Sequence, residues 1–477
     1  MTSTLSFDPE LLRRYDRPGP RYTSYPTAPQ FTPAFTDADL REHIGRSNAR
    51  GHALSIYAHM PFCASPCFYC ACNRVITRDT ARAEHYLECL LREAAETGAF
   101  IDERREVLQL HLGGGTPNFF RPAQIGRLLE TLARRLRLSE RPERDFSIEL
   151  DPRAVPPREI AELAALGFNR ASLGVQDFDP QVQLAVNRIQ SVEETLGVIE
   201  ACRANGFRSV NVDLIYGLPM QTLAGFERTL ATIIGARPDR LAVYGYAHLP
   251  DLFKPQRQLD TTFLPHPELR IRLLAMAIER LSAAGYRYIG MDHFALPEDD
   301  LARAREAGGL QRNFMGYTTH ADSDLIGLGV SAISHIGATF SQNERDLAGW
   351  HAAVEAGRMP LWRGLVLDAD DLLRADVIQQ VMCRGEIDVR ATEARHAIEF
   401  QTYFASAASA LRTLEADGLV AIDPAVIRAT ARGQLLLRLI AMCFDRYLGA
   451  VPATASAPRY SRVVCSGRTA LSGRRQR

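Results

Sequence analysis

The chain has 477 residues, of which 46% are hydrophobic and 23% are charged, a globular composition long enough for two or three domains. Acidic and basic residues balance at 56 each, so we expect neither nucleic acid nor an anionic membrane as a partner. The first residues lack the basic-then-apolar pattern of a secretory signal, and no apolar run is long and unbroken enough to predict a membrane span.

Residues 1–50 are rich in proline, tyrosine and arginine, which predicts an extended arm laid over a core. From residue 53, short β-prone runs alternate with amphipathic helical stretches, the pattern of βα units around a parallel sheet. This rhythm predicts a partial or complete (β/α) barrel, and we assign residues 51–360 to the barrel and its extension. The strand candidates are residues 53–60, 107–114, 146–152, 170–178, 209–217 and 241–250, with a weaker seventh at 286–294.

The last third of the chain changes in character. Residues 325–343 are the longest uncharged stretch, and their interruption by glycines and serines predicts a buried loop region. Helical stretches with short connectors predict a small, mostly helical C-terminal domain over residues 361–450. Residues 451–477, including the basic segment after Arg462, are small and polar, which predicts a flexible tail.

Five of the nine cysteines are scattered singly along the chain. Such usage is typical of a reduced protein and not of a disulfide framework, so we expect a cytoplasmic location. We expect a monomer, since the sequence contains no coiled-coil pattern or other assembly seam.

Polar residues gather where the predicted strands end. The active sites of (β/α) barrels are built from the C-terminal ends of the strands and the loops that follow. We therefore predict an active site at one mouth of the barrel. The residues concerned are Cys63 to Cys72, Gly113 to Thr116, Glu149 and Asp151, Gln176 and Asp177, Asp213 and Tyr216, and Tyr246 to His248.

The first of these loops holds four cysteines, with the spacing Cys63-x3-Cys67-x2-Cys70-x-Cys72. Zinc sites usually draw on two separated ligand pairs, and no second pair lies nearby. A redox dithiol needs only C-x-x-C, which Cys67 and Cys70 provide, but the surrounding thiols argue against it. The spacing favours an iron–sulfur cluster, with zinc and redox roles as alternatives.

The cysteine loop and the "GGGTP" that follows the next strand resemble the signature of the radical S-adenosylmethionine (SAM) superfamily. The likeness is closer still to the oxygen-independent coproporphyrinogen III oxidases. The blocks that carry it are "GPRYTSYPTA", "YAHMPFCASPCFYCACN", "HLGGGTPNFF", "SIELDPR", "SLGVQDFDPQVQLAVNRIQ", "VNVDLIYGLPMQT" and "RNFMGYTT", in this order along the chain.

The resemblance implies a role for each matching residue. Three cysteines would bind a [4Fe–4S] cluster whose open iron holds SAM, and a second SAM site would lie beside the first. Catalysis would involve Cys72, Tyr57 and His59. The cluster ligands would be Cys63, Cys67 and Cys70; the SAM on the cluster would contact Tyr57, Gly114, Glu149 and Ile333; the second SAM would contact Tyr69, Gly115, Thr116, Gln176, Arg188, Asp213 and Ala247.

The reaction so implied is anaerobic oxidative decarboxylation of coproporphyrinogen III to protoporphyrinogen IX in haem biosynthesis. A SAM-derived 5′-deoxyadenosyl radical would abstract a propionate β-hydrogen, and an electron donor of flavodoxin or ferredoxin type would feed the cluster. Arg21 and Arg312 are candidates for binding the substrate carboxylates, which favour arginine forks. Met315 stands where the best-known members have glutamine, which leaves the substrate contacts less defined.

Two alternatives remain at this stage. A haem-binding branch of the same superfamily keeps three cluster cysteines but lacks the counterparts of Cys72 and of the "GPRYTSYPTA" arm, both present here. The other alternative is a non-enzymatic barrel with a structural zinc clip, which would bind a partner through its helical C-terminal domain.

Overall fold

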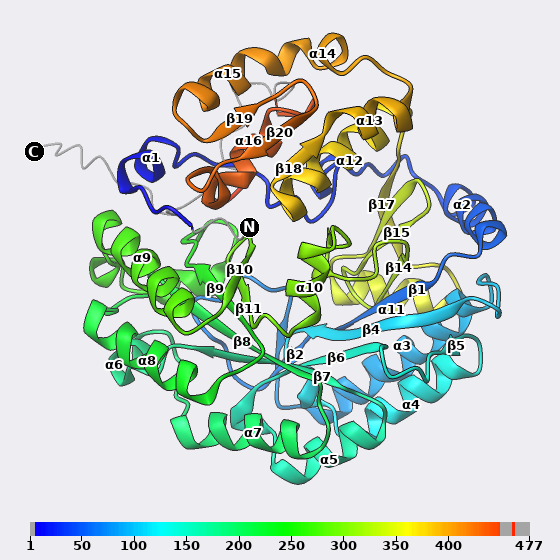
Figure 1. Ribbon diagram of the computed structural model, residues 1–477. Coiled ribbons are helices and arrows are strands. Elements are labelled where there is room, and N and C mark those ends of the chain that lie inside the picture. Colours follow the sequence, from blue (N-terminus) through cyan, green and yellow to red (C-terminus); the bar gives the residue numbers. More distant parts are fainter. Residues whose placement is uncertain (1–4, 449–459, 463–477) are drawn as a thin grey trace, which may run out of the picture.

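The computed structural model of the chain describes residues 5–448 and 460–462. Six parallel strands form the centre of the molecule, and all six strong strand predictions are confirmed (Figure 1). Adjacent strands of this set are neighbours in the chain as well as in the sheet. They are β1 (Leu54–Met60), β4 (Glu106–Gly114), β6 (Asp145–Leu150), β7 (Arg170–Gln176), β8 (Ser209–Tyr216) and β9 (Arg240–Gly245).

Helices connect these strands and cover the outer face of the sheet (Figure 1). Helix α4 buries Ile125, Leu128 and Leu132, which recur every three or four residues and so share one face. Helix α7 begins with a capping box between Ser191 and Glu194. The connecting helices are α3 (Thr80–Gly98), α4 (Pro122–Ala133), α5 (Pro157–Ala165), α6 (Pro180–Ala185), α7 (Val192–Ala204), α8 (Leu223–Ala236) and α9 (Pro267–Ala283).

The sheet stays open, so the barrel is partial. The predicted seventh barrel strand is wrong: residues 286–294 form the antiparallel hairpin of β10 (Arg287–Gly290) and β11 (His293–Ala295), and β11 pairs antiparallel with β9. The chain reverses at Gly290, Met291 and Asp292, which have φ values of 135°, 41° and 77°. A left-handed turn of this kind breaks a strand in two.

The other edge of the sheet also corrects the sequence analysis. Residues 325–343, predicted as a buried loop region, are mostly strand. The glycines that suggested a loop, Gly329 and Gly337, have φ values of 91° and 56° and form turns between strands. Strand β14 continues the sheet parallel to β1, and three antiparallel strands follow it. The elements are β14 (Asp324–Leu328), β15 (Ile333–Ile336), β16 (Thr339–Asn343), β17 (Leu361–Val366) and, between the last two, α11 (Leu347–Glu355).

The C-terminal domain lies over one end of the sheet (Figure 1). It is mostly helical, as predicted, and adds a small antiparallel sheet in the order β18-β20-β19. Its buried side chains form a core with residues of the N-terminal arm, among them Leu12, Tyr22 and Tyr25. The elements are α12 (Ala369–Arg384), β18 (Glu386–Asp388), α13 (Val389–His396), α14 (Phe400–Tyr403), α15 (Ala408–Ala416), β19 (Val420–Ile422), β20 (Val426–Ala429) and α16 (Leu437–Met442).

The N-terminal arm runs between the barrel and the C-terminal domain (Figure 1). Arg438 Nε donates to the carbonyl of Pro20 at 2.9 Å and fixes the arm to the domain. The prediction of an extended arm is wrong over α1 (Pro9–Arg14) and α2 (Asp37–Arg50). The capping box of α2, between Thr36 and Asp39, was a readable helix start.

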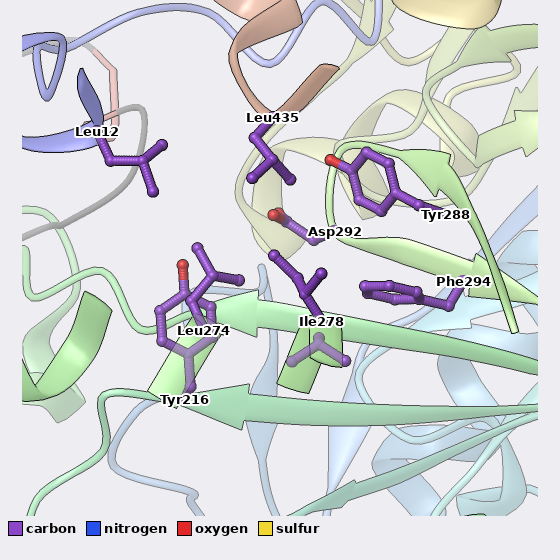
Figure 2. A pocket seen from close by; sticks show the side chains of 9 residues that line it. Leu12, Tyr216, Leu274, Ile278, Tyr288, Asp292, Phe294 and Leu435 are labelled. Carbon is purple, nitrogen blue, oxygen red and sulfur yellow. The ribbon is translucent and has the colours of Figure 1, made fainter. Parts of the chain in front are cut away.

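The arm, the barrel and the C-terminal domain meet around a small cavity of about 20 Å³ (Figure 2). Leu12 of the arm, Leu435 of the domain and Tyr216 of β8 line it. This volume holds about one water molecule, so the three parts are closely packed here.

Of the predicted tail, only residues 460–462 are described. Arg462 forms an antiparallel β-bridge with Pro18 of the arm, and the segment after it lies outside the described residues. In the described part of the chain, no helix combines the length and apolarity that a membrane crossing requires.

Candidate active site

The four clustered cysteines lie directly after β1, between the short parallel strands β2 (Phe62–Cys63) and β3 (Val75–Ile76). Cys63 and Cys67 are buried, Cys70 is half-buried and Cys72 is exposed. Arg74 holds the loop in shape because its guanidinium donates to the carbonyls of Cys67, Cys70 and Cys72 at 3.1, 3.3 and 3.5 Å. Sequence analysis did not single out Arg74.

Each of the three predicted ligand sulfurs accepts a hydrogen bond. Thr116 Oγ1 donates to Cys63 Sγ at 3.2 Å, and the backbone N–H of Cys72 donates to Cys70 Sγ at 3.4 Å. Arg188 Nη1 donates to Cys67 Sγ at 3.6 Å. Hydrogen bonds to thiolate sulfurs, and a guanidinium beside them, stabilise the ionised form that binds metal and tune a cluster's potential.

The spacing of these sulfurs tests what they can hold. No three ligand atoms among Cys63, Cys67, Cys70 and Cys72 lie within 4.8 Å of one another. Thiolates around a single zinc ion would be about 3.8 Å apart, given Zn–S bonds of about 2.3 Å. Three thiolates on three corners of an iron–sulfur cube stand farther apart. The three free thiols of Cys63, Cys67 and Cys70 match the ligand set of a [4Fe–4S] cluster with one open iron.

The glycine loop after β4 lies against the cysteine segment with no room for side chains. A Cβ at Gly115 would stand 2.6 Å from the carbonyl carbon and oxygen of Pro61. Gly114 has a φ of 114°, and a Cβ there would meet the ring of His59 at 2.5 Å. The Gly115 N–H donates to Met60 O at 2.9 Å. Glycine is required at both positions, and the bare backbone forms a cradle beside the thiols.

A cavity of about 320 Å³ opens at this end of the strands. Its lining includes every residue predicted to contact the SAM on the cluster, together with the predicted catalytic residues His59 and Cys72. Sequence analysis missed four residues of the wall: Asn73, which directly follows Cys72, and Phe314, Ser331 and Ala332, which carry no charged or ligating group. The lining residues are Tyr57, His59, Cys72, Asn73, Gly114, Glu149, Phe314, Ser331, Ala332 and Ile333.

The hydrogen bonds of Tyr57 and His59 fix both side chains. His59 Nε2 lies 2.8 Å from Asn73 O, and Nδ1 lies 2.9 Å from Tyr57 OH. A carbonyl oxygen only accepts, so Nε2 carries the hydrogen and Nδ1 accepts from the Tyr57 hydroxyl. Burial lowers the pKa of His59, so the ring is neutral at physiological pH.

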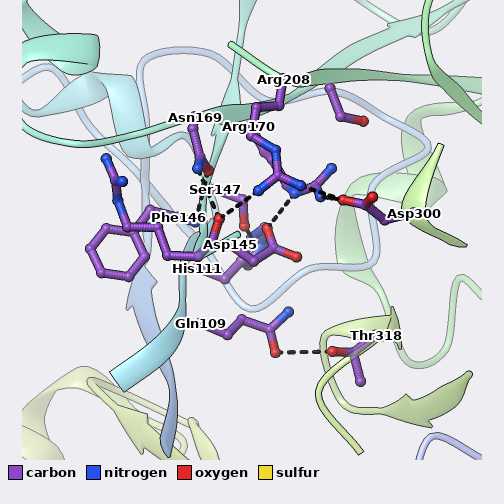
Figure 3. Close-up of polar contacts among 12 residues, drawn as sticks. Gln109, His111, Asp145, Phe146, Ser147, Asn169, Arg170, Arg208, Asp300 and Thr318 are labelled. Carbon is purple, nitrogen blue, oxygen red and sulfur yellow. Dashed lines mark hydrogen bonds and ion pairs between the residues drawn. The ribbon is translucent and has the colours of Figure 1, made fainter. Parts of the chain in front are cut away.

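Glu149 ends β6 and brings a carboxylate to the same cavity. Its Oε2 accepts from the Gly114 N–H at 3.0 Å, and His111 Nε2 lies 3.4 Å from Oε1. Ser147 holds the other ring nitrogen of His111 at 2.6 Å (Figure 3). Burial acts to raise the pKa of Glu149, but His111 and the Gly114 amide outweigh it and hold that pKa below its usual value. A charged carboxylate therefore faces the cavity.

Further polar side chains lie near His111 and Ser147, among them Gln109, Asp145 and Arg170 (Figure 3). Gln109 Oε1 accepts from Ser55 of β1 and from Thr318 of β13 (Gly316–Thr318), at 3.0 and 3.2 Å. Arg170 Nε lies 2.8 Å from Asp145, and Arg170 Nη2 also pairs with Asp300. These buried pairs fix the strands that carry the site.

The residues predicted for the second SAM do not line this cavity. One of them, Arg188, contacts Cys67. Arg188 Nη2 donates to Gly174 O at 2.5 Å and lies 3.4 Å from Asp151, which Arg153 also holds. Asp213 accepts from Asn211 Nδ2 at 2.8 Å, and burial raises the pKa of Asp213 to about 7.

The other members of this group are held by backbone geometry. The carbonyls of Tyr69 and Ala247 both accept from Gln256 Nε2 at 3.0 Å. Gln176 ends β7 with a φ of 69°, and Thr116 donates to Cys63 as described above. Thr116 and Tyr69 thus connect this set to the cysteine loop.

The arginines proposed for the substrate lie near each other above the barrel. Arg21 Nη2 lies 2.8 Å from Asp292 Oδ2. Arg312 Nε donates to Arg21 O at 3.2 Å, while its buried Nη1 has no hydrogen-bond partner among the described residues. A third arginine, Arg438, is close enough to Arg21 that repulsion adds to burial in lowering the pKa of Arg438 to about 10. This excess of positive charge suits an anionic ligand.

Met315 follows Phe314 in the turn between β12 (Gln311–Asn313) and β13, and its N–H donates to Asn313 Oδ1 at 2.9 Å. Phe314 lines the cavity, whereas Met315 does not.

Comparison with known proteins adds independent findings. Residues 57–233 match the family model of the radical SAM superfamily, and residues 367–436 match the HemN C-terminal domain. The chain is 48% identical over 464 residues to the "Oxygen-independent coproporphyrinogen III oxidase" of Pseudomonas aeruginosa, across 97% of this chain and 100% of that protein. The Escherichia coli (strain K12) protein of the same name is 42% identical over 460 residues, across 96% and 99%.

A solved structure is similar over nearly the whole chain. Coproporphyrinogen III oxidase (HemN) from Escherichia coli, described as a radical SAM enzyme, superposes with a TM-score of 0.89 at 41% identity. The match covers 93% of this chain and 100% of the other.

Proposed function

Because the chain belongs to the family of oxygen-independent coproporphyrinogen III oxidases, we propose that it decarboxylates two propionates of coproporphyrinogen III to vinyl groups without oxygen, yielding protoporphyrinogen IX. The observation that carries the proposal is the cavity of about 320 Å³ that Tyr57, Glu149 and Cys72 line, on a chain whose three predicted cluster ligands are free thiols. The product serves haem biosynthesis.

The cofactors of this proposal are a [4Fe–4S] cluster and SAM. Cys63, Cys67 and Cys70 hold the cluster. When bound, the pair supplies one-electron reduction and hydrogen abstraction. Around the cluster-bound SAM we place the four residues that line the cavity, and around a second SAM the residues predicted for it. These are Tyr57, Gly114, Glu149 and Ile333, and then Tyr69, Gly115, Thr116, Gln176, Arg188, Asp213 and Ala247.

The chain's own residues orient the reactants and control protons. The Glu149 carboxylate is positioned to pair with the positive charge of SAM. The neutral His59 ring fixes the Tyr57 hydroxyl, which points its hydrogen at Nδ1 and not into the cavity. The Cys72 thiol faces the cavity without belonging to the ligand set, and we assign it to turnover. We assign the substrate carboxylates to Arg312, whose Nη1 has no hydrogen-bond partner among the described residues, and to Arg21, one nitrogen of which pairs with Asp292.

The arm and the C-terminal domain cover the mouth of the barrel and limit the access of water and oxygen. A flavodoxin- or ferredoxin-type donor supplies the electrons, and the enzyme works as a monomer. The eight described cysteines are all unpaired, which supports a reducing compartment, the cytoplasm.

The testing experiment is an anaerobic assay with SAM, a reductant and coproporphyrinogen III. Brown protein with about four irons per chain supports the cluster, whereas colourless zinc-bound protein contradicts it. Vinyl product and 5′-deoxyadenosine should form together. Cys72→Ser should keep its iron and lose turnover, while Cys202→Ser, a buried cysteine of α7 far from the loop in sequence, should keep both. Full activity of the Cys72 variant removes that assignment.

A further inference from the structure

Two helices on the outside of the sheet face each other with pairs of metal-ligating side chains. His85 and Cys89 lie four residues apart on α3, and His351 and Glu355 lie four residues apart on α11. Residues at this spacing share one helix face. None of the four lines the active-site cavity or belongs to the cysteine loop.

The ligating atoms of these side chains converge. One ligand atom each from His85, Cys89 and His351 lies within 4.8 Å of the other two, and this is the one such group within residues 5–448 and 460–462. The two histidine rings are 4.6 Å apart between centroids, at 77°. Glu355 Oε1 lies 3.1 Å from His85 Nε2, so a carboxylate lies beside the group without belonging to it.

One of these ligating atoms has no hydrogen-bond partner among the described residues. Nε2 of His351 is buried and has no hydrogen-bond partner. Buried polar atoms are nearly always satisfied, by protein, water or an ion. Cys89 beside it is 1% exposed, so its sulfur is shielded from solvent and from casual oxidation.

We propose that His85, Cys89 and His351 bind a zinc ion, with Glu355 held against His85 beside it. Thiolate and imidazole donors together are a set that zinc accepts, and the side chains that supply them come from two different helices. The ion links α3 to α11. Neither this inference nor its test depends on the proposed reaction.

The position of the site indicates what the link stabilises. Tyr86 follows His85 and Trp350 precedes His351, and their rings lie 4.5 Å apart between centroids. Tyr86 OH donates to His59 O at 2.7 Å and accepts from Val330 N–H at 3.2 Å. His59 lines the cavity, and Val330 precedes Ser331 of its wall. The zinc site therefore supports the cavity from behind and contributes stability, not chemistry.

The test uses the full chain purified anaerobically with its iron in place, dialysed against Zn²⁺. Bound zinc and iron are measured together, and zinc-edge X-ray absorption reports the ligands. We expect one zinc per chain, with one sulfur at about 2.3 Å and histidine nitrogens at about 2.0–2.1 Å. His85→Asn, at a half-exposed position, should weaken zinc binding about tenfold or more. His52→Asn, at an exposed histidine outside the group, should not.

Cys89→Ser gives a second readout, since it should remove the sulfur shell while leaving the iron content unchanged. Zinc bound with equal affinity by the His85 variant overturns the proposal, as does a chain that binds no zinc. A sulfur shell that persists in Cys89→Ser places the zinc on other cysteines, such as Cys72, and also overturns it.

Discussion

Replacing Glu149 with glutamine removes a negative charge from the cavity and changes little else. In the wild-type chain the Gly114 N–H donates to Glu149 Oε2 at 3.0 Å. Glutamine has the same length and keeps one oxygen that can accept this hydrogen bond. The contact given up is the longer one of 3.4 Å to His111. The fold and the cluster should therefore persist in Glu149→Gln, and the loss should fall on SAM, whose amino and sulfonium groups are cationic.

The magnitude follows from the kind of interaction lost. A hydrogen bond to a charged group contributes about 1.5–3 kcal/mol, which corresponds to about 10- to 150-fold in Kd. The Glu149 side chain is 42% exposed because it faces the cavity. Solvent screening then favours the lower part of the range, about 10- to 40-fold.

The assay is calorimetric titration of SAM into anaerobic, iron-loaded protein, with iron content and Tm measured on the same samples. Glu106→Gln is the matched control, because Glu106 begins β4 at the opposite end of the strands and pairs with Arg137. If Glu149→Gln binds SAM within about twofold of the wild type at full iron content, the placement of SAM against this carboxylate is refuted.

Three further predictions concern the loop, the buried acid and the arginines. Gly115→Ala should lower stability by about 1–3 kcal/mol and weaken SAM binding, because the new Cβ would stand 2.6 Å from the Pro61 carbonyl. The control is Gly45→Ala, which has open space around it and should not lower the stability measured by thermal unfolding. Burial raises the pKa of Asp213 from 3.8 to about 7, so the folded protein binds the extra proton and loses stability as pH rises through this window. Asp213→Asn should accordingly gain Tm relative to the wild type from pH 5 to pH 8, and a constant difference contradicts the assignment. Arg312→Gln should raise the KM for coproporphyrinogen III about tenfold or more, and an unchanged KM removes Arg312 from the substrate site.

Much of this architecture is readable from the sequence because the signals are local. Strands such as residues 209–217 are short β-prone runs, and their parallel order follows from the helices between them. The cysteine spacing and the glycine loop are equally local signals, so the cluster ligands and Gly114 could be predicted, whereas four residues of the cavity wall could not.

The wrong predictions concern segments whose secondary structure depends on pairing with strands distant in the sequence. In residues 286–294 the turn at Gly290 is the one local feature that distinguishes the β10–β11 hairpin from a single barrel strand. Strand β9, with which β11 pairs, lies some 50 residues earlier in the chain. The first strand within residues 325–343, β14, forms by pairing with β1, which is distant in the sequence. The missed residues Arg74 and His111 act on backbone carbonyls and on Glu149, contacts that only the folded chain creates.

The central claim is that this cavity converts coproporphyrinogen III by removing a propionate β-hydrogen. The most direct measurement supplies substrate deuterated at the propionate β-carbons, with SAM and reductant under anaerobic conditions, and follows the label by mass spectrometry. We expect vinyl product together with 5′-deoxyadenosine that carries deuterium. Unlabelled 5′-deoxyadenosine without vinyl product, from iron-loaded protein, contradicts it.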